Sequence, residues 1–292
     1  MILLDGKKTS QELKEEIAVE VAAMRQQGQK VPHLAAVIVG NDGASLTYVS
    51  SKVRSCEQVG FESTLVRLPE DTTQEDLLKE VAALNANEAI DGYIVQLPLP
   101  AHLDEEEVLL AIDPKKDVDG FHPTNFGRMA LELESFIPAT PFGIMQLLER
   151  YKVDTSGKHA VVIGRSHIVG RPISILLSQK GDFANATVTV AHSRTKDLKA
   201  LLNQADIIVS ALGVPNFVKA DMVKPGAVVI DVGITRVEDA SRPKGYRIVG
   251  DVDFEQVAEK ASYITPVPGG VGPMTIAMLL KNTLLARRRA QS

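Results

Sequence analysis

The chain has 292 residues, 45% of them apolar and 24% charged, which is enough for two globular domains of ordinary size. A net charge of -5, the lack of tryptophan and the lack of a basic run interleaved with aromatic residues argue against a nucleic-acid partner. One cysteine, Cys56, excludes an internal disulfide and a multi-cysteine metal site, and no run approaches the roughly 20 apolar residues of a membrane span.

The two ends of the chain carry no targeting or nucleic-acid signal. The first ten residues, MILLDGKKTS, have only three apolar residues after Met1 and no charge before them, unlike a signal peptide. The basic cluster at residues 287–289 is expected to be the frayed, solvated end of the last helix. We therefore expect a cytoplasmic protein with no membrane partner.

The first half of the chain alternates predicted helices with predicted strands. Thr9 and Glu12 form a possible capping box for a first helix, and Gly28 stands where a C-terminal cap belongs. The alternation favours a parallel sheet with crossover helices, in which ligands gather at the carboxyl ends of the strands. The predicted strands are residues 34–39, 61–68 and 93–97, and the predicted helices between them are residues 45–59 and 73–86.

Polar residues collect near two of these strand ends. Ser45, Tyr48 and Lys52 are spaced three and four apart, so they share one face of the second helix. A tyrosine beside a partly buried lysine is an acid/base candidate, because burial lowers the pKa of a lysine toward the working pH. The alternative is a surface lysine that lies over a tyrosine ring, and spacing alone favours it. Gln96 interrupts the third apolar run, so its amide must find polar partners or face a ligand.

The loop at residues 113–123 places Asp117 and Asp119 beside Gly120 with no apolar period. Such a loop is either a simple turn or a site that presents one carboxylate to a ligand. An ionised aspartate accepts two parallel N–H bonds from an amidine-like edge of a heterocycle.

The second half enters through a proline-punctuated helix at residues 136–151, which we interpret as the bridge between two domains. The segment VVIGRSHIVGRP, residues 161–172, then predicts a strand, a turn on Gly164 and a helix that begins near Gly170. Backbone N–H groups at such a helix start bind a pyrophosphate. Ser166 stands where the dinucleotide fingerprint GxGxxG has its second glycine, so an ordinary strand-to-helix turn stays open.

The next apolar run, residues 186–191, indicates which dinucleotide would bind. An NAD site carries an acidic residue in this region for the ribose 2′-hydroxyl, and this chain has none there. Ser193 and Arg194 offer a hydroxyl and a cation instead, and Arg165 offers a second cation, which suits the 2′-phosphate of NADP. The alternative is that both arginines are solvated loop cations.

The remaining runs are expected to complete the second domain. They cover residues 206–210, 227–231 and 247–250, and each ends in small or polar residues that let a flat cofactor lie close to the backbone. Residues 266–273 contain three prolines and three glycines, which predicts a rigid, shaped loop. An apolar helix follows, to residue 285.

Five segments, taken together and in this order, resemble one known family. They are YVSSK at 48–52, VQLPLP at 95–100, KDVDG at 116–120, GRS with IVG at 164–170, and PVPGGVGPMT at 266–275. The chain resembles the bifunctional methylenetetrahydrofolate dehydrogenase/methenyltetrahydrofolate cyclohydrolase family over nearly its whole length.

The resemblance implies two α/β domains with parallel-sheet cores and an active-site cleft between them. Residues 1–140 with the C-terminal helix 272–292 would form the folate-binding catalytic domain, and residues 141–271 a Rossmann-type NADP-binding domain. The implied activity is NADP-linked oxidation of 5,10-methylenetetrahydrofolate to the methenyl form, followed by hydrolysis to 10-formyltetrahydrofolate. A homodimer without a metal is also implied.

The resemblance further assigns roles to single residues. Lys52 would be the catalytic lysine, Tyr48 would stack on or hydrogen-bond the folate, Gln96 would tune Lys52, and Asp119 would hold the pterin ring. Further implied substrate contacts are Ser45, Leu97, Val267, Pro268, Gly269 and Gly270, and implied cofactor contacts are Gly164, Arg165, Ser166, Ile168, Ser193, Arg194, Gly213, Ile234 and Thr275. One departure is Ala139, where many members have cysteine, and we expect little consequence from it.

Two other functions stay open at this point. Another two-domain NADP-dependent dehydrogenase, of the shikimate or amino-acid type, would share the Rossmann half but has no reason to carry KDVDG or PVPGGVGP. A non-catalytic nucleotide or folate binder is the second alternative, and it leaves Lys52, Gln96 and Asp119 without a purpose.

Overall fold

The structure is a computed structural model that describes residues 1–41, 43–242 and 245–291, without the side chains of residues 44, 45 and 47. The chain divides into two compact units. The large-sheet unit comprises Met1–Ser10 and Thr140–Thr275, and the small-sheet unit comprises Gln11–Ala139 and Ile276–Ser292.

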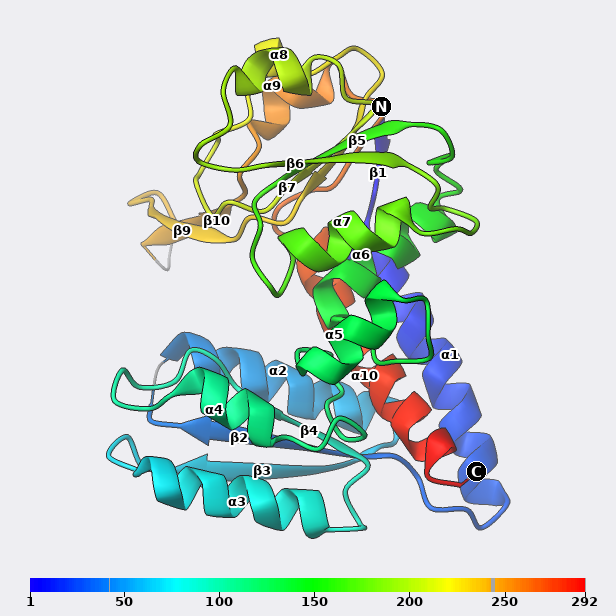
Figure 1. Ribbon diagram of the computed structural model, residues 1–292, viewed down its shortest axis with the longest axis vertical. Helices are drawn as coiled ribbons and strands as arrows, with labels where there is room; N and C mark the ends of the chain where they lie inside the picture. The colour runs from blue at the N-terminus through cyan, green and yellow to red at the C-terminus, as the bar shows by residue number, and fades with distance from the viewer. Residues whose placement is uncertain (42, 243–244, 292) are drawn as a thin grey trace. The chain divides into compact units, whose positions relative to one another are not determined.

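The small-sheet unit is built on parallel strands that, among the described residues, lie in the order β3-β2-β4. Two helices, α2 and α3, lie on opposite faces of this sheet (Figure 1). Because both faces are covered, every residue of β2 after His33 is buried. The elements are β2 (His33–Val39), α2 (Gly43–Val59), β3 (Glu62–Leu68), α3 (Gln74–Ala86), β4 (Gly92–Val95), α4 (Glu105–Ala111) and α5 (Pro123–Ala130).

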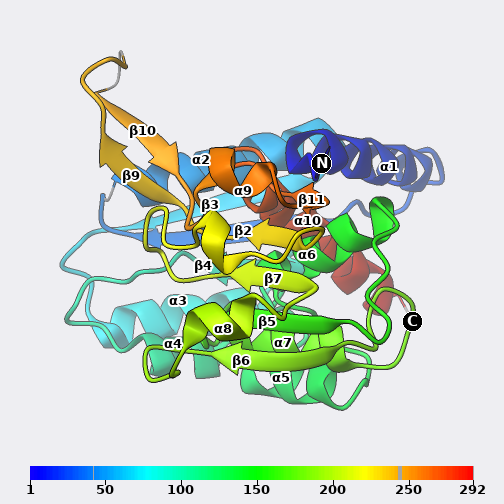
Figure 2. The same ribbon diagram turned by 90° about the horizontal axis from the view of Figure 1, so that it is seen from above.

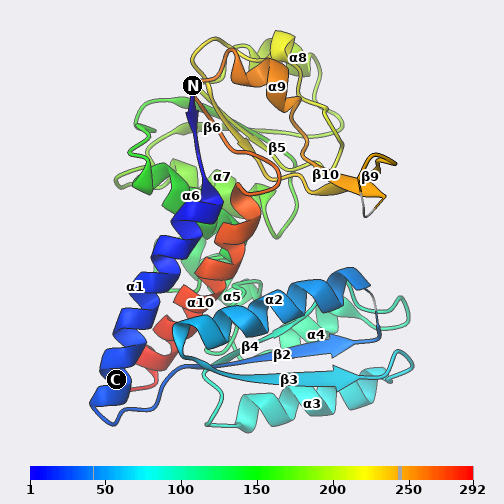
Figure 3. The same cartoon turned by 180° about the vertical axis from the view of Figure 1, so that it is seen from behind.

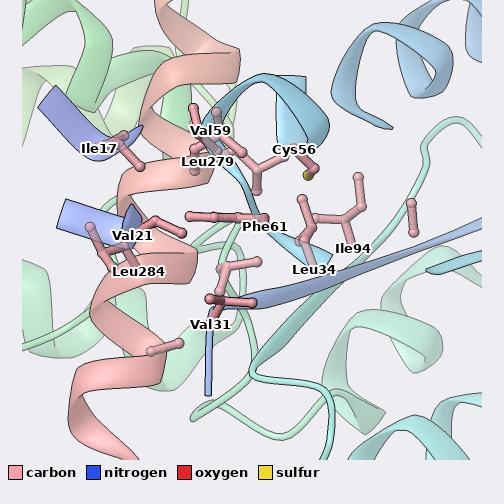
Figure 4. Close-up of a cluster of buried hydrophobic side chains, with 14 of the residues drawn as sticks. Ile17, Val21, Val31, Leu34, Cys56, Val59, Phe61, Ile94, Leu279 and Leu284 are labelled. Atoms are coloured by element: carbon pink, nitrogen blue, oxygen red, sulfur yellow. The ribbon is translucent and has the colours of Figure 1, made fainter. Parts of the chain in front are cut away.

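Alternate residues of β2 belong to two separate hydrophobic cores, as the period of a strand requires. Leu34 and Ile38 join a cluster with Phe61 and with α2, α1 (Gly6–Gln26) and α10 (Val271–Arg289) (Figure 4). Val37 and its alternate neighbours pack instead against α3 and α4. Within this unit, α1 and α10 lie side by side (Figure 3). The last helix of the chain therefore contributes to the core of the small-sheet unit.

Two expectations about helix ends need correction. The first helix begins at Gly6, before the predicted capping box, because the Asp5 carboxylate accepts the backbone N–H of Lys8 at 2.9 Å. Thr9 is helical, and its hydroxyl donates to the Asp5 carbonyl. The predicted frayed end at residues 287–289 is wrong, since α10 runs to Arg289 and the Arg287 guanidinium donates to the Lys30 carbonyl at 3.1 Å.

The large-sheet unit has, in the part of the chain that is described, six parallel strands in the order β1-β11-β8-β7-β5-β6. Helices α6 and α7 lie on one face, and α8 and α9 on the other (Figure 1). The elements are β1 (Ile2–Leu3), α6 (Ala139–Arg150), β5 (His159–Ile163), α7 (Gly170–Ser178), β6 (Thr187–Ala191), α8 (Leu198–Leu202), β7 (Ile207–Ser210), the 3-10 turn η1 (Ala220–Met222), β8 (Val228–Asp231), α9 (Phe254–Ala258) and β11 (Tyr263–Ile264).

The first ten residues lie in a different unit from the one that the sequence suggests. The predicted division is 1–140 with 272–292 against 141–271, whereas the compact units divide at 139/140 and 275/276 and place Met1–Ser10 with the large sheet. The reason is that β1 pairs with β11, Ile2 opposite Tyr263 and Leu3 opposite Ile264. A two-residue strand carries no periodic signal, so only the fold reveals this pairing.

The run at residues 247–250 is not a strand of the large sheet. It overlaps β10 (Tyr246–Val249), which pairs antiparallel with β9 (Thr235–Glu238). Together they form a hairpin that projects from the sheet (Figure 2). Exposure alternates along β9, which is typical of a ribbon with one solvated face.

Candidate active site

Lys52 lies on α2 in the small-sheet unit and is buried, with 5% of its surface exposed. Its Nζ lies 4.8 Å from the centroid of the Tyr48 ring, one helical turn earlier, and donates a 3.3 Å hydrogen bond to Gln96 Oε1. The amide nitrogen of Gln96 donates to the Leu97 carbonyl at 2.7 Å, which fixes the amide so that its oxygen faces the lysine. The alternative of a surface lysine that lies over a tyrosine ring is therefore only partly right. The contact with the ring exists, but the lysine is buried and not at the surface.

The electrostatics of this cluster favour proton transfer. Burial lowers the pKa of Lys52 below its ordinary value of 10.5, and the carboxylate of Asp119 acts in the opposite direction. Burial raises the pKa of Asp119, and Lys52 opposes that shift. Cys56, one turn beyond Lys52, has a pKa raised to about 12 by burial, so its thiol is neutral at physiological pH. A lysine whose pKa burial lowers gives up its proton more readily than an exposed lysine, which suits a general base.

The loop that carries Asp119 is held by two buried side chains. The Asp117 carboxylate accepts the backbone N–H groups of Phe121 at 3.1 Å and His122 at 2.9 Å. Asn282, on α10, donates to the Val118 carbonyl at 2.8 Å. Asp119 thus lies between backbone positions that Asp117, in the same loop, and Asn282, on α10, hold in place, which suits a ligand-binding carboxylate.

The turn after β5 has the features of a phosphate-binding turn. Gly164 has a φ of 113°, and a side chain on Gly170 would overlap the Gly164 carbonyl, so both positions require glycine. The Ser166 hydroxyl accepts the backbone N–H groups of Val169 at 3.2 Å and Gly170 at 3.3 Å. Ser166, at the position where the dinucleotide fingerprint has a glycine, therefore accepts the N–H of the first residue of α7.

The cations expected near a 2′-phosphate follow neighbouring strands. β5 and β6 pair with Ile163 opposite Ala191. Arg165 and Ser193 each lie two residues beyond that pair, at the carboxyl edge of the sheet, and both are exposed, as is Arg194. A hydroxyl and two cations thus stand at adjacent strand ends, where a parallel sheet of this kind binds the ribose of a dinucleotide.

Two family profiles match the chain. The tetrahydrofolate dehydrogenase/cyclohydrolase catalytic domain matches residues 4–119, and the NAD(P)-binding domain of the same family matches residues 138–291. The chain belongs to the tetrahydrofolate dehydrogenase/cyclohydrolase family. The resemblance seen in the sequence is confirmed.

Relatives of this tetrahydrofolate dehydrogenase/cyclohydrolase chain match it from end to end. A bifunctional protein FolD from Flavobacterium johnsoniae is 72% identical over 288 residues, which cover 99% of this chain and 98% of the relative. The crystal structure of a bifunctional FolD dehydrogenase/cyclohydrolase from Campylobacter jejuni has a TM-score of 0.93 and 48% identity, with 99% of each chain covered. A Trypanosoma brucei FolD, complexed with NADP cofactor and inhibitor, has a TM-score of 0.94 and 42% identity, with 100% of this chain and 98% of that chain covered.

The shikimate-type alternative finds support in the fold alone. A shikimate 5-dehydrogenase from Thermus thermophilus has a TM-score of 0.53 at 16% identity, with 88% of this chain and 99% of that chain covered. This likeness shows that the two chains have a similar fold, and it gives no information about the reaction.

The structure divides the other predicted contacts of this family member between its two units. Leu97 follows β4 in the small-sheet unit and is partly buried, whereas Ser45 lies on α2 with its side chain outside the described residues. The remaining predicted contacts all lie in the large-sheet unit: Ile168, Gly213 and Ile234, which are exposed, and Val267, Pro268, Gly269, Gly270 and Thr275, of which Gly270 is buried. Thr275 pairs its hydroxyl with that of Thr140 at 3.0 Å.

Sequence reasoning gave no role of their own to three buried polar residues. Asn282 stands in an apolar helix, and Asp231 and Asp251 end or follow apolar runs. A polar residue in an otherwise apolar helix or strand end is the signal that could have found them. No group of three or more His, Cys, Asp or Glu side chains within residues 1–41, 43–242 and 245–291 could hold a metal ion. No helix in the same part of the chain has the length and hydropathy to cross a bilayer.

Proposed function

We propose that this chain is an NADP-dependent methylenetetrahydrofolate dehydrogenase that also hydrolyses its own product, methenyltetrahydrofolate, to 10-formyltetrahydrofolate. The observation that carries the proposal is the buried Lys52, which is hydrogen-bonded to Gln96 and attracted to the opposite charge of Asp119, in a chain of the matching family. A non-catalytic binder has no use for a buried lysine whose pKa burial lowers.

Asp119 is assigned to the pterin. Its partly buried carboxylate lies on a loop that Asp117 and Asn282 fix, and the aminopyrimidine edge of a pterin offers two parallel N–H donors to such a group. Tyr48 is assigned to stack on or hydrogen-bond the folate beside it. These contacts hold the one-carbon group in one place for both reactions.

Oxidation needs little from the protein beyond position. Bound NADP would supply the acceptor for the hydride that leaves the methylene carbon. The two nitrogens that flank this carbon stabilise the cation that forms, so no strong base takes part. The residues assigned to hold NADP are Gly164, Arg165, Ser166, Ser193 and Arg194, with Ile168, Gly213, Ile234 and Thr275. The glycine turn and the exposed cations at adjacent strand ends suit a phosphorylated dinucleotide.

Hydrolysis is the step that requires Lys52. Water adds to the methenyl carbon and loses a proton to the neutral amine of Lys52. The bond from that carbon to the pteridine ring nitrogen then breaks: the nitrogen takes the proton from Lys52, the hydroxyl loses its proton to solvent, and the 10-formyl group remains. Gln96 holds that amine through its Oε1, and the bond from Gln96 to the Leu97 carbonyl keeps the amide in the required orientation. Lys52 is thus assigned as the catalytic base and Gln96 as the group that orients it.

The test is turnover. Purified chain is mixed with methylenetetrahydrofolate and NADP, and the appearance of reduced nicotinamide is followed by absorbance. Methenyltetrahydrofolate is then supplied alone, and its hydrolysis is followed by the loss of its own absorbance. Both signals are expected. Binding without turnover would support the non-catalytic alternative, and turnover of a shikimate-type or amino-acid substrate instead would support the other dehydrogenase.

The assembly and location are also proposals. We propose a homodimer in the cytoplasm with no nucleic-acid partner. The net charge of -5 and a single buried, free thiol, Cys56, support the last two points. Light scattering of the purified chain tests the dimer, and fractionation of cells that express it tests the location.

A further inference from the structure

Two carboxylates, Asp231 and Asp251, are buried in the large-sheet unit and take no part in the chemistry proposed above. Asp231 is the last residue of β8, and Asp251 lies two residues after β10. Unpaired carboxylates are rarely buried in proteins, because the loss of solvent is costly. Their hydrogen bonds explain how this pair is tolerated.

Asp251 holds the loop that follows β7. Its Oδ2 accepts the backbone N–H of Leu212 at 2.7 Å and the hydroxyl of Ser210 at 3.2 Å, and its Oδ1 accepts the N–H of Val214 at 2.9 Å. Gly213, between the two bonded residues, is exposed with a φ of 70°. The carboxylate thus fixes the backbone on both sides of a predicted cofactor contact.

Asp231 holds the next loop and Asp251 itself. Its Oδ1 accepts the N–H of Gly233 at 2.9 Å, directly before the predicted cofactor contact Ile234, which is 61% exposed. The same oxygen accepts the N–H of Asp251 at 2.9 Å, and Oδ2 accepts that of Val252 at 2.9 Å. One carboxylate therefore fixes the segment that carries the other.

Each carboxylate lies against a backbone position that must be glycine, because any side chain there would overlap it. A side chain on Gly233 would overlap the Asp251 carboxylate, and one on Gly250 would overlap the Asp231 carboxylate. Both loops follow the carboxyl ends of adjacent parallel strands, Ser210 opposite Asp231, which is the edge where such sheets bind cofactors.

We propose that Asp251, held in place by Asp231, is a positioning residue for the cofactor: it fixes the loops of Gly213 and Ile234 in the conformation that binds NADP. This inference rests on the proposed function, which assigns both residues as cofactor contacts. Asp251 does not touch NADP. It acts through the backbone, so its loss weakens the binding of the cofactor and leaves hydrolysis in the other unit unchanged.

The test is Asp251→Asn with two readouts, the Kd for NADP by calorimetry and the rate of methenyltetrahydrofolate hydrolysis without cofactor. Whichever way the amide is turned, its NH2 faces a backbone N–H that had an acceptor, so we expect the Kd for NADP to rise about tenfold or more. Hydrolysis is expected to change less than twofold, which shows that the chain is folded. The control is Asp253→Asn, which removes the same charge two residues away, where the carboxylate pairs with Lys219 at 3.1 Å, and which should change neither readout.

Equal Kd values for Asp251→Asn and the unmodified chain would overturn the inference, as would a parallel loss of hydrolysis in a folded variant. If Asp251→Asn does not fold, Ser210→Ala tests the inference instead, because it removes one hydrogen-bond donor to the Asp251 carboxylate. It should raise the Kd for NADP by about two- to threefold, and no rise would overturn the inference. Failure of the proposed function is seen separately, as absent turnover in the unmodified chain.

Discussion

The two units each bury a charged group, and the two groups are held in different ways. Lys52 in the small-sheet unit has, among the described side chains, one hydrogen bond, at 3.3 Å to Gln96, and a ring contact with Tyr48. Asp251 in the large-sheet unit accepts three hydrogen bonds, two of them from backbone N–H groups. Both groups are buried ionisable side chains, and they carry opposite charges.

The difference lies in how firmly each charge is satisfied. A buried carboxylate whose oxygens accept several fixed donors holds the backbone that surrounds it. A buried amine held by a single long hydrogen bond and a ring contact remains free to exchange a proton. Lys52 belongs to the second kind and Asp251 to the first, and the following experiments examine that distinction.

The largest effect is expected from Lys52→Met. The substitution keeps the length of the side chain and removes the amine, so hydrolysis should fall at least a thousandfold while folate still binds, because the proposed proton acceptor is gone. The measurement is the hydrolysis rate together with folate affinity by calorimetry. Lys14→Met is the matched control: Lys14 is half-buried with a pKa that burial also lowers, yet its Nζ donates to Ser55. Unchanged hydrolysis in Lys52→Met would refute the assigned role.

The second effect concerns pH. If neutral Lys52 accepts the proton, the hydrolysis rate at saturating folate falls about tenfold for each pH unit below the pKa of Lys52 and levels off above it. Because burial lowers this pKa, the midpoint should lie below 10.5. The dehydrogenase rate needs no base, so its profile over the same range should be flat. Parallel profiles for the two reactions would show that Lys52 is a structural charge like Asp251.

A smaller effect is expected from Arg165→Ala, which tests an exposed charge rather than a buried one. If Arg165 pairs with the 2′-phosphate, the KM for NADP should rise about tenfold or more, and that for NAD should change less than threefold. Initial rates with each dinucleotide measure the difference. Equal losses for both would remove Arg165 from the 2′-phosphate site.

The smallest effect is expected from Asn282→Ala, which removes a support from the Asp119 loop. The Val118 and Ile137 carbonyls lose their 2.8 Å and 2.9 Å donors, which should cost roughly 1–3 kcal/mol in the free energy of unfolding and raise the KM for folate a few-fold. Thr283→Ala is the control, since its hydroxyl donates within α10, to the Leu279 carbonyl, and has no other bond among the described residues. Thermal unfolding and folate kinetics are compared. A KM that rises equally in both variants would show that Asn282 has no particular effect on the loop.

The sequence alone gave the parallel-sheet class, the strands at β2, β5 and β6, and the residues of the Lys52 cluster. These are local signals: an apolar run ended by a turn, or polar residues three and four apart on one helix, reports its own structure. The family resemblance added what local signals lack, the roles of Gln96 and Asp119. That Lys52 and the turn at Gly164 border one cleft stays a prediction.

The tertiary structure decided what depends on residues far apart in the chain. Spacing favoured an exposed Lys52, and the structure buries it, because burial depends on the strands and loops that pack against α2. The pairing of β1 with β11 joins Ile2 to Tyr263, and Asn282 reaches a carbonyl 164 residues away. Asp231 and Asp251 look alike in the sequence as two acidic residues near strand ends. Only the fold shows that backbone N–H groups satisfy both, since hydrogen bonds across 20 to 40 residues leave no periodic trace in a sequence.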